Sequence, residues 1–184
     1  MEIAHEIDLQ TMIPSSNRKD RPVTDADRKQ KSAFSNGELT LHAPGDLECM
    51  QTAASYSFPL RIDMTAKTNS SNIRLYYKDG RLILNWEINK DELKIHDMLT
   101  GKGYGYHGIG RVPENEYVDI TWIIGRNEML VLVNEEVRHI EGDYPYMASR
   151  AAALNNKICE PVRISAAWGS TVTVKSLQVT ELEI

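Results

Sequence analysis

The stretch that decides the fold is residues 72–97, which read NIRLYYKDGRLILNWEINKDELKIHD. Apolar and polar residues alternate along it in three short runs, and Asp79-Gly80 between the first two is a strong hairpin signal. A period of two sends successive side chains to opposite faces of a sheet. The stretch therefore predicts three antiparallel strands with one apolar and one polar face.

The two faces of this predicted unit differ in chemistry. Counting alternate residues assigns to the apolar face Ile73, Leu75, Tyr77, Leu82, Leu84, Trp86, Ile88, Leu93 and Ile95. The same counting assigns to the polar face Arg74, Tyr76, Arg81, Asn85, Glu87, Asn89, Lys94 and His96, with Ile83 as an apolar exception there. We expect the apolar face to pack on a core and the polar face to be the first candidate binding surface.

Alternation typical of strands continues on both sides of this stretch. The further strand candidates are residues 2–9, 37–42, 56–67, 117–125, 129–133, 137–140, 162–168 and 171–184. The last two are expected to form a hairpin across Gly169-Ser170, and a jump in inward parity predicts a bulge near Lys175-Ser176. Residues 14–31 are polar with mixed charge and predict a solvated loop, and residues 147–154 are the best helical candidate.

Ten or eleven short strands, with turn signals every eight to twelve residues, predict an all-β fold. The natural packing for them is a two-sheet antiparallel β-sandwich of ten or more strands with one short helix at most. The length of 184 residues fits a single domain over 1–184. Within it, 1–33 would supply an N-terminal strand and polar loop, and 34–184 the main sandwich.

Composition and termini restrict the class of partner and compartment. The net charge of −5 argues against a nucleic-acid partner. The N-terminal MEIAHEIDLQ lacks the apolar segment of a secretion signal, and no window approaches a membrane span, so no membrane partner is expected. We expect a cytoplasmic protein, although a processed secreted protein would read the same way. Cys49 and Cys159 are expected to be reduced thiols rather than a bridge.

The order of these elements resembles the concanavalin A-like lectin/glucanase jelly roll, the superfamily of galectins, laminin G domains and laminarinase-type hydrolases. The segments that carry the resemblance are 34–41, 58–64 leading into 72–76, 116–122 running into 130–134, and 174–182. It covers the chain from about Phe34 onward. The resemblance implies a jelly roll and a sheet face that contacts glycans.

The catalytic signature of the laminarinase-type enzymes is not reproduced. That signature is a strand reading Glu-x-Asp-x-x-Glu, and its nearest match is Glu116-Tyr-Val-Asp119, whose spacing puts the two carboxylates on opposite faces of a strand. The galectin pattern, His-x-Asn-x-Arg followed by Trp-x-x-Glu-x-Arg, is absent as well, and Trp86-Glu87 does not replace it. We therefore lean against an enzyme, and expect Glu87 to form a cross-strand ion pair with Lys94 or Arg74.

Residues 99–113 form a glycine-rich connection that contains the letters of a dinucleotide fingerprint, Gly103-Tyr-Gly-Tyr-His-Gly108. A strand follows it instead of the helix that would hold a pyrophosphate, so this match is rejected. Two interpretations stay open, a plain loop or a flap over the polar face with Tyr104, Tyr106 and His107 as contacts.

Metal and cofactor signals are weak throughout the chain. The five histidines show no spacing typical of zinc ligands. Structural calcium is common among the lectins that the chain resembles, but no Asp/Asn cluster imitates their loops. We expect no cofactor. Trp86, Trp122 and Trp168 share parity with aliphatic neighbours, which favours core positions over sugar-stacking ones.

The leading hypothesis is a non-catalytic, lectin-like module that binds a carbohydrate or another small polar ligand on the polar sheet face. The expected contacts are Arg74, Tyr76, Asn85, Glu87 and His96, with Tyr104, Tyr106 and His107 from the flap. The alternatives are a protein-interaction domain, including a homo-oligomer that assembles through a sheet face or edge, and a hydrolase or lyase acting on sugars.

Overall fold

The computed structural model describes residues 2–15, 32–43, 48–126, 128–142 and 158–183. These ranges contain seventeen strands and one 3-10 turn, Leu9–Thr11. The all-β sandwich predicted from the sequence is confirmed. The predicted helix at 147–154 and most of the predicted loop at 14–31 lie outside the described residues.

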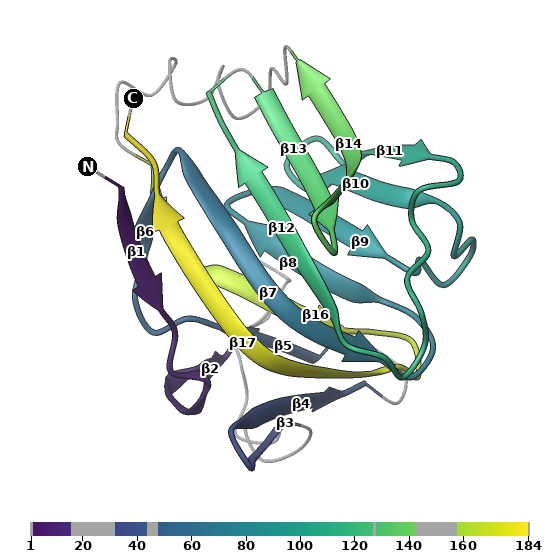
Figure 1. Ribbon diagram of the computed structural model, residues 1–184, viewed down its shortest axis with the longest axis horizontal. Coiled ribbons are helices and arrows are strands. Elements are labelled where there is room, and N and C mark those ends of the chain that lie inside the picture. The colour runs from purple at the N-terminus through teal and green to yellow at the C-terminus, as the bar shows by residue number, and fades with distance from the viewer. Residues whose placement is uncertain (1, 16–31, 44–47, 127, 143–157, 184) are drawn as a thin grey trace.

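The larger sheet has eight antiparallel strands and forms the near layer in Figure 1. Its order is β14-β13-β12-β7-β17-β4-β3, and β1 also pairs with β17. The strands are β1 (Ile3–Glu6), β3 (Ser32–Ser35), β4 (Glu38–His42), β7 (Leu60–Thr68), β12 (Val118–Ile124), β13 (Glu128–Val133), β14 (Glu136–Gly142) and β17 (Thr171–Glu181).

The seven-stranded sheet lies behind it, in the order β11-β10-β9-β8-β16-β5-β2 (Figure 1). Its strands are β2 (Ile13–Pro14), β5 (Glu48–Gln51), β8 (Ile73–Tyr77), β9 (Gly80–Leu84), β10 (Leu93–Asp97), β11 (Lys102–Tyr106) and β16 (Val162–Ala166). A separate short ladder pairs β6 (Tyr56–Ser57) with β15 (Cys159–Glu160). Cys49 and Cys159 are both free thiols.

The core lies between the two sheets and is built by alternation. From the seven-stranded sheet it takes the predicted inward residues Ile73, Leu75, Tyr77, Leu82, Leu84, Leu93 and Ile95. From the eight-stranded sheet it takes, among others, Leu60, Ile62, Met64, Ile120, Trp122 and Val131. Burial of these side chains on both layers is the main stabilising term of the fold.

Two of the turns differ from those predicted from the sequence. In the first hairpin the loop residues are Lys78 and Asp79, because Tyr77 pairs with Gly80, and Lys78 takes the left-handed conformation. The predicted hairpin across Gly169-Ser170 is wrong, because β16 and β17 belong to different sheets and the turn between them crosses the sandwich. The bulge predicted near Lys175-Ser176 is confirmed by the register shift between Val174 and Ser176.

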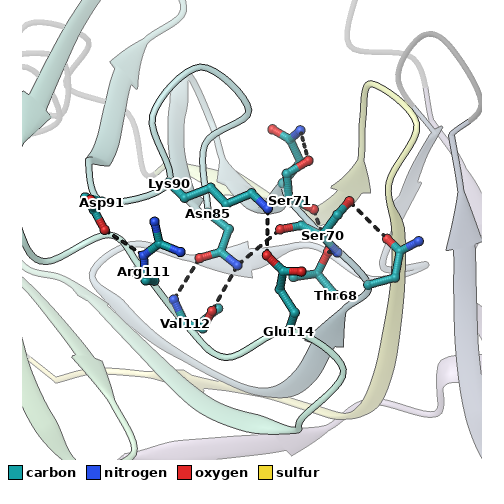
Figure 2. Close-up of polar contacts among 11 residues, drawn as sticks. Thr68, Ser70, Ser71, Asn85, Lys90, Asp91, Arg111, Val112 and Glu114 are labelled. Atoms are coloured by element: carbon teal, nitrogen blue, oxygen red, sulfur yellow. Dashed lines mark hydrogen bonds and ion pairs between the residues drawn. The ribbon is translucent and has the colours of Figure 1, made fainter.

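Strand β9 ends one residue before Asn85, which adopts a left-handed conformation with φ 50°. Its buried amide accepts from Val112 N (2.7 Å) and donates to Val112 O (3.0 Å) and Ser70 O (3.3 Å). Figure 2 shows this clip between two loops, flanked by the ion pairs Lys90–Glu114 and Arg111–Asp91. The prediction that Asn85 faces outward from a strand is therefore wrong.

The left-handed residue also reverses the alternation that follows it. Trp86 was expected beside Leu84 in the core, but its ring centroid lies 4.3 Å from the ammonium of Lys94, an outward residue of β10. Ile88, predicted to be inward, is 75% exposed. One turn residue thus moves a tryptophan from the apolar to the polar side of the sheet.

We expect Asn85→Ala to lower the free energy of unfolding by about 2–4 kcal/mol, because it leaves three buried polar groups without partners and strains a left-handed backbone. Asn85→Gly keeps the backbone conformation without strain but loses the same hydrogen bonds, so it should still cost about 2 kcal/mol. Urea denaturation of both variants measures the two contributions. Full recovery of stability in the glycine variant would show that the amide bonds contribute nothing.

Candidate functional site

The outward side of the seven-stranded sheet carries two rows of cross-strand neighbours, and directly opposed residues of paired strands share one face. The first row runs over five strands through Arg163, Tyr76, Arg81, His96 and Gly103. The second runs beside it through Ser165, Arg74, Ile83, Lys94 and Gly105. We call Arg74, Tyr76, Arg81, Lys94, His96 and Arg163 the cationic face.

Tyr76 lies at the centre of the first row between two guanidinium groups. The guanidinium carbon of Arg163 is 5.4 Å from the ring centroid and that of Arg81 is 5.9 Å away. The Tyr76 hydroxyl is 3.0 Å from Ser165 Oγ, and the ring is fully buried. Tyr76 therefore supports the two arginines by cation–π attraction and has no exposed surface of its own.

Arg74 is 4% exposed and fixed by two partners. Its Nε and Nη2 donate to Asn72 Oδ1 at 2.9 and 2.7 Å, and Nη2 also donates to Glu87 Oε2 at 3.0 Å. Asn72 is fixed in turn by donating to Ala167 O. The predicted ion pair between Glu87 and Arg74 is confirmed, and it orders the chain just after the Asn85 turn.

Lys94 joins the second row to the aromatic side of the site. Its ammonium donates to Glu92 Oε1 at 3.0 Å and lies over the Trp86 ring. Gly105 makes room for this pair, because a Cβ there would lie 1.3 Å from Glu92 Oε1. Trp86 is only partly buried, so part of its indole is open beside the charged rows.

His96 lies on β10, directly opposite Gly103 of the edge strand β11. A Cβ on the opposing Gly103 would be 2.9 Å from His96 Cε1, so only glycine admits the imidazole at this position. Burial, followed by the charges of Arg81, Lys94 and Arg74, lowers the pKa of His96 to about 4. The ring is therefore neutral at physiological pH, and its enclosed Nε2 has no hydrogen-bond partner.

Among the cations of the face, Arg81 has the fewest polar partners in the described ranges. Its enclosed Nε has no acceptor, and within the described ranges the side chain makes no ion pair. Arg163 donates to the carbonyl of Lys78 at 3.0 Å but meets no carboxylate in the same ranges. Both residues are partly exposed, and in the described ranges both guanidinium groups lack a carboxylate partner.

The predicted flap is a strand. Lys102–Tyr106 forms β11, and its register with β10 places Tyr104 opposite Ile95 and Tyr106 opposite Leu93, on the side away from the cationic face. The Tyr106 hydroxyl donates to Glu141 Oε2 at 2.8 Å, and its ring lies 3.9 Å from that of His139. Tyr106 thus joins the edges of the two sheets, and His107 lies in the exposed turn that follows β11.

Four of the eight predicted contacts, Arg74, Tyr76, Glu87 and His96, come together at the cationic face. Asn85, Tyr104, Tyr106 and His107 do not join it. Sequence reasoning did not select Arg81, Arg163 or Trp86. Alternation signals the first two, since Arg81 follows the hairpin on the polar parity and Arg163 lies between the inward Val162 and Ile164.

The carboxylates of this region are committed to other contacts. Glu87 and Glu92 bond to cations of the face, and Asp97 points inward, where it accepts from Leu99 N and Thr100 Oγ1. Asp119, from the nearest match to a hydrolase signature, lies on the outward face of the other sheet and accepts from Thr65 Oγ1 at 2.6 Å. The described residues of the cationic face therefore offer donors in excess of acceptors.

No three His, Cys, Asp or Glu side chains in the described ranges gather as metal ligands would. No helix in those ranges is long and apolar enough to cross a membrane.

No protein-family model matches the chain, and no curated protein sequence matches it. Solved structures do match. A glycosidic hydrolase superimposes with a TM-score of 0.64 at 8% identity, over 97% of this chain and 94% of its own. A laminarinase catalytic domain from Thermotoga maritima gives 0.56 at 12% identity over 85% and 82%, and a carbohydrate-binding module from Bacillus subtilis gives 0.56 at 9% over 79% and 88%.

The fold is a concanavalin A-like jelly roll. The resemblance inferred from the order of the strands is thereby confirmed at the level of fold. Concanavalin A-like sandwiches among these matches include both glycan-cleaving and glycan-binding proteins, so the fold does not choose between the two. The choice between cleavage and binding therefore depends on the chemistry of the cationic face.

His96 should make stability depend on pH. The unfolded ring takes up a proton near pH 6.5 and the folded ring only near pH 4, so the unfolded chain binds more protons between these values. Stability from the neutral ring is fully present above about pH 6.5 and is lost as the pH falls toward 4. We expect a loss of about 1–2 kcal/mol, allowing for solvent access to the ring.

Urea denaturation near neutral pH and near pH 4 measures this loss. His96→Gln should flatten the difference between the two pH values, whereas the control His107→Gln, an exposed residue, should leave it unchanged. An equal pH dependence in wild type and His96→Gln would contradict the assignment.

Proposed function

We propose that the protein is a non-catalytic carbohydrate-binding module whose cationic face holds the ligand. The observation that carries this proposal is the first cross-strand row, where Arg81 and Arg163 flank Tyr76 and neither meets a carboxylate in the part of the chain that the structure describes. Guanidinium donors that meet no carboxylate in the described ranges suit a ligand rich in hydroxyl and ring oxygens.

The chemistry of the site matches a sugar in two respects. Guanidinium groups are planar donors that can bond two oxygens at once, and vicinal hydroxyls offer such a pair. Trp86, partly open beside Lys94, supplies an apolar ring on which the C–H face of a sugar can pack. Arg74 and Tyr76 are too buried to touch a ligand, so we assign them positioning roles.

Binding without turnover is favoured by the state of the carboxylates. Glycoside hydrolysis requires two carboxyl groups that flank the scissile bond at about 5–5.5 Å or about 6.5–9.5 Å from each other. On this face Glu87 Oε2 accepts from Arg74 and Glu92 Oε1 accepts from Lys94, so one oxygen of each carboxylate is held against a cation.

Self-association through the same face is the competing hypothesis. A two-fold axis would set the cationic face of one copy against that of another and bring the unpaired Arg81 and Arg163 side chains near their own copies. Like charges at an interface are unfavourable. A polar ligand with acceptor groups satisfies the same donors without that repulsion.

A glycan array followed by calorimetry on the best ligand tests the proposal. We expect Arg81→Ala and Trp86→Ala each to weaken binding by about tenfold or more, the loss of one charge-assisted hydrogen bond or one stacking contact. Arg81 has no hydrogen-bond partner in the described ranges, so its removal should leave the thermal midpoint nearly unchanged.

The matched control is Arg61→Ala. Arg61 lies on the outward side of the eight-stranded sheet, where it bonds to Asp63, so the variant removes the same charge from the opposite surface. Its affinity should equal that of the wild type. Absence of any glycan ligand, or equal losses in the Arg61 and Arg81 variants, would remove the proposal.

A further inference from the structure

The charges of the cationic face do not balance. Its four cations, Arg74, Arg81, Lys94 and Arg163, meet two carboxylates, and Glu87 and Glu92 are each paired with one cation. The two cations without a carboxylate in the described ranges, Arg81 and Arg163, are neighbours of the same ring. The surplus positive charge is therefore local, on a chain whose net charge is −5.

The two unpaired guanidinium groups are held close together. Since their carbon atoms lie 5.9 and 5.4 Å from the Tyr76 centroid, they are at most about 11 Å apart. Their strands, β16 and β9, are separated by one strand and so lie about 10 Å apart. Two like charges at this distance repel each other, and an anion between or beside them would remove that repulsion.

The rest of the first row adds no carboxylate that could balance the two arginines. Arg81 Nε and His96 Nε2 are both enclosed and without a hydrogen-bond partner. His96 brings no negative charge to balance the arginines, and Gly103 beyond it adds no side chain. The row consequently presents positive charge from Arg163 to Arg81 without an internal counter-charge.

We infer that the ligand of the cationic face is an acidic glycan, whose carboxylate or sulfate oxygens bind Arg81 and Arg163. This inference rests on the proposed function and adds the chemical class of the sugar. A planar guanidinium can bond two oxygens of one carboxylate or sulfate, which is stronger and more selective than a bond to a hydroxyl. A neutral sugar would leave the surplus charge uncompensated.

Calorimetry with matched ligand pairs tests the inference on the full chain near neutral pH. The first pair is a short oligogalacturonate and its methyl ester, which share a backbone and differ in charge. The second is a sulfated oligosaccharide and its desulfated form, which separates sulfate from carboxylate as the source of the oxyanion. We expect one charged member to bind at least about tenfold more tightly than its neutral counterpart.

The variants assign that preference to the row. Arg81→Gln and Arg163→Gln should each lower affinity for the charged ligand about tenfold or more and lower affinity for the neutral ligand by less, because glutamine keeps a hydrogen-bond donor and loses the charge. Arg61→Gln, with the same loss of charge on the opposite surface, should change neither affinity. Raising salt from about 0.05 M to about 0.5 M should weaken binding of the charged ligand alone.

The outcomes separate the two proposals. Equal binding of the charged and neutral members, lost in Trp86→Ala, would overturn the acidic-glycan inference and keep the carbohydrate-binding function. Binding of polyglutamate as tightly as of oligogalacturonate would overturn the choice of a sugar, because charge alone would then explain the affinity. Binding of no member of either pair, together with an empty glycan array, would overturn both.

Discussion

The left-handed turn at Asn85 is the constraint on which the polar surface of this sandwich depends. Its amide bonds both backbone groups of Val112 and the carbonyl of Ser70, so one side chain ends a strand and ties two loops to it. The backbone of Asn85 adds bonds from Asn72 N and to Gly110 O. Buried networks of this kind stabilise when every member is satisfied and are costly when one is missing.

The position of the aromatic and acidic parts of the site follows from that turn. Because the chain leaves the strand at Asn85, Trp86 moves to the outward side beside Lys94, and Glu87 reaches Arg74. A regular strand through Asn85 would bury Trp86 next to Leu84 and separate it from the charged rows. Local backbone geometry, more than composition, thus places an open indole beside cations.

The sequence predicted the fold well because the fold is encoded by a simple period. Alternation identified the inward residues of β7, β8, β10 and β12, and turn residues marked most of their ends. Alternation gave the wrong face for Asn85, Trp86 and Ile88, because a single left-handed residue shifts the parity of the residues that follow it. An asparagine in the sequence does not by itself predict that conformation. Strand β11 was not predicted, because its glycines are typical of a loop. In the structure Gly103 and Gly105 leave space for the side chains of His96 and Glu92.

The site was less predictable for a related reason. Which polar residues lie together depends on strand order, and Arg163 joins Tyr76 only because β16 pairs with β8 across a long separation in sequence. Alternation gives the face of each residue but not its neighbour on the next strand. Half of the predicted contacts reached the cationic face. Alternation placed Arg81 on the polar side, but only the register showed that Arg163 lies across Tyr76 from it.

The same register sets the charge balance of this surface. A catalytic pair needs two carboxyl groups directed at the ligand, and here the outward carboxylates are directed sideways, at Arg74 and Lys94. They pair with cations of the second row, while the guanidinium groups of the first row meet no carboxylate in the described residues. Both guanidinium groups of the first row lie beside the buried Tyr76 ring, which attracts them by cation–π interaction. The two rows therefore differ in charge balance: the outward carboxylates neutralise cations of the second row, and the two arginines of the first row meet no carboxylate in the described ranges.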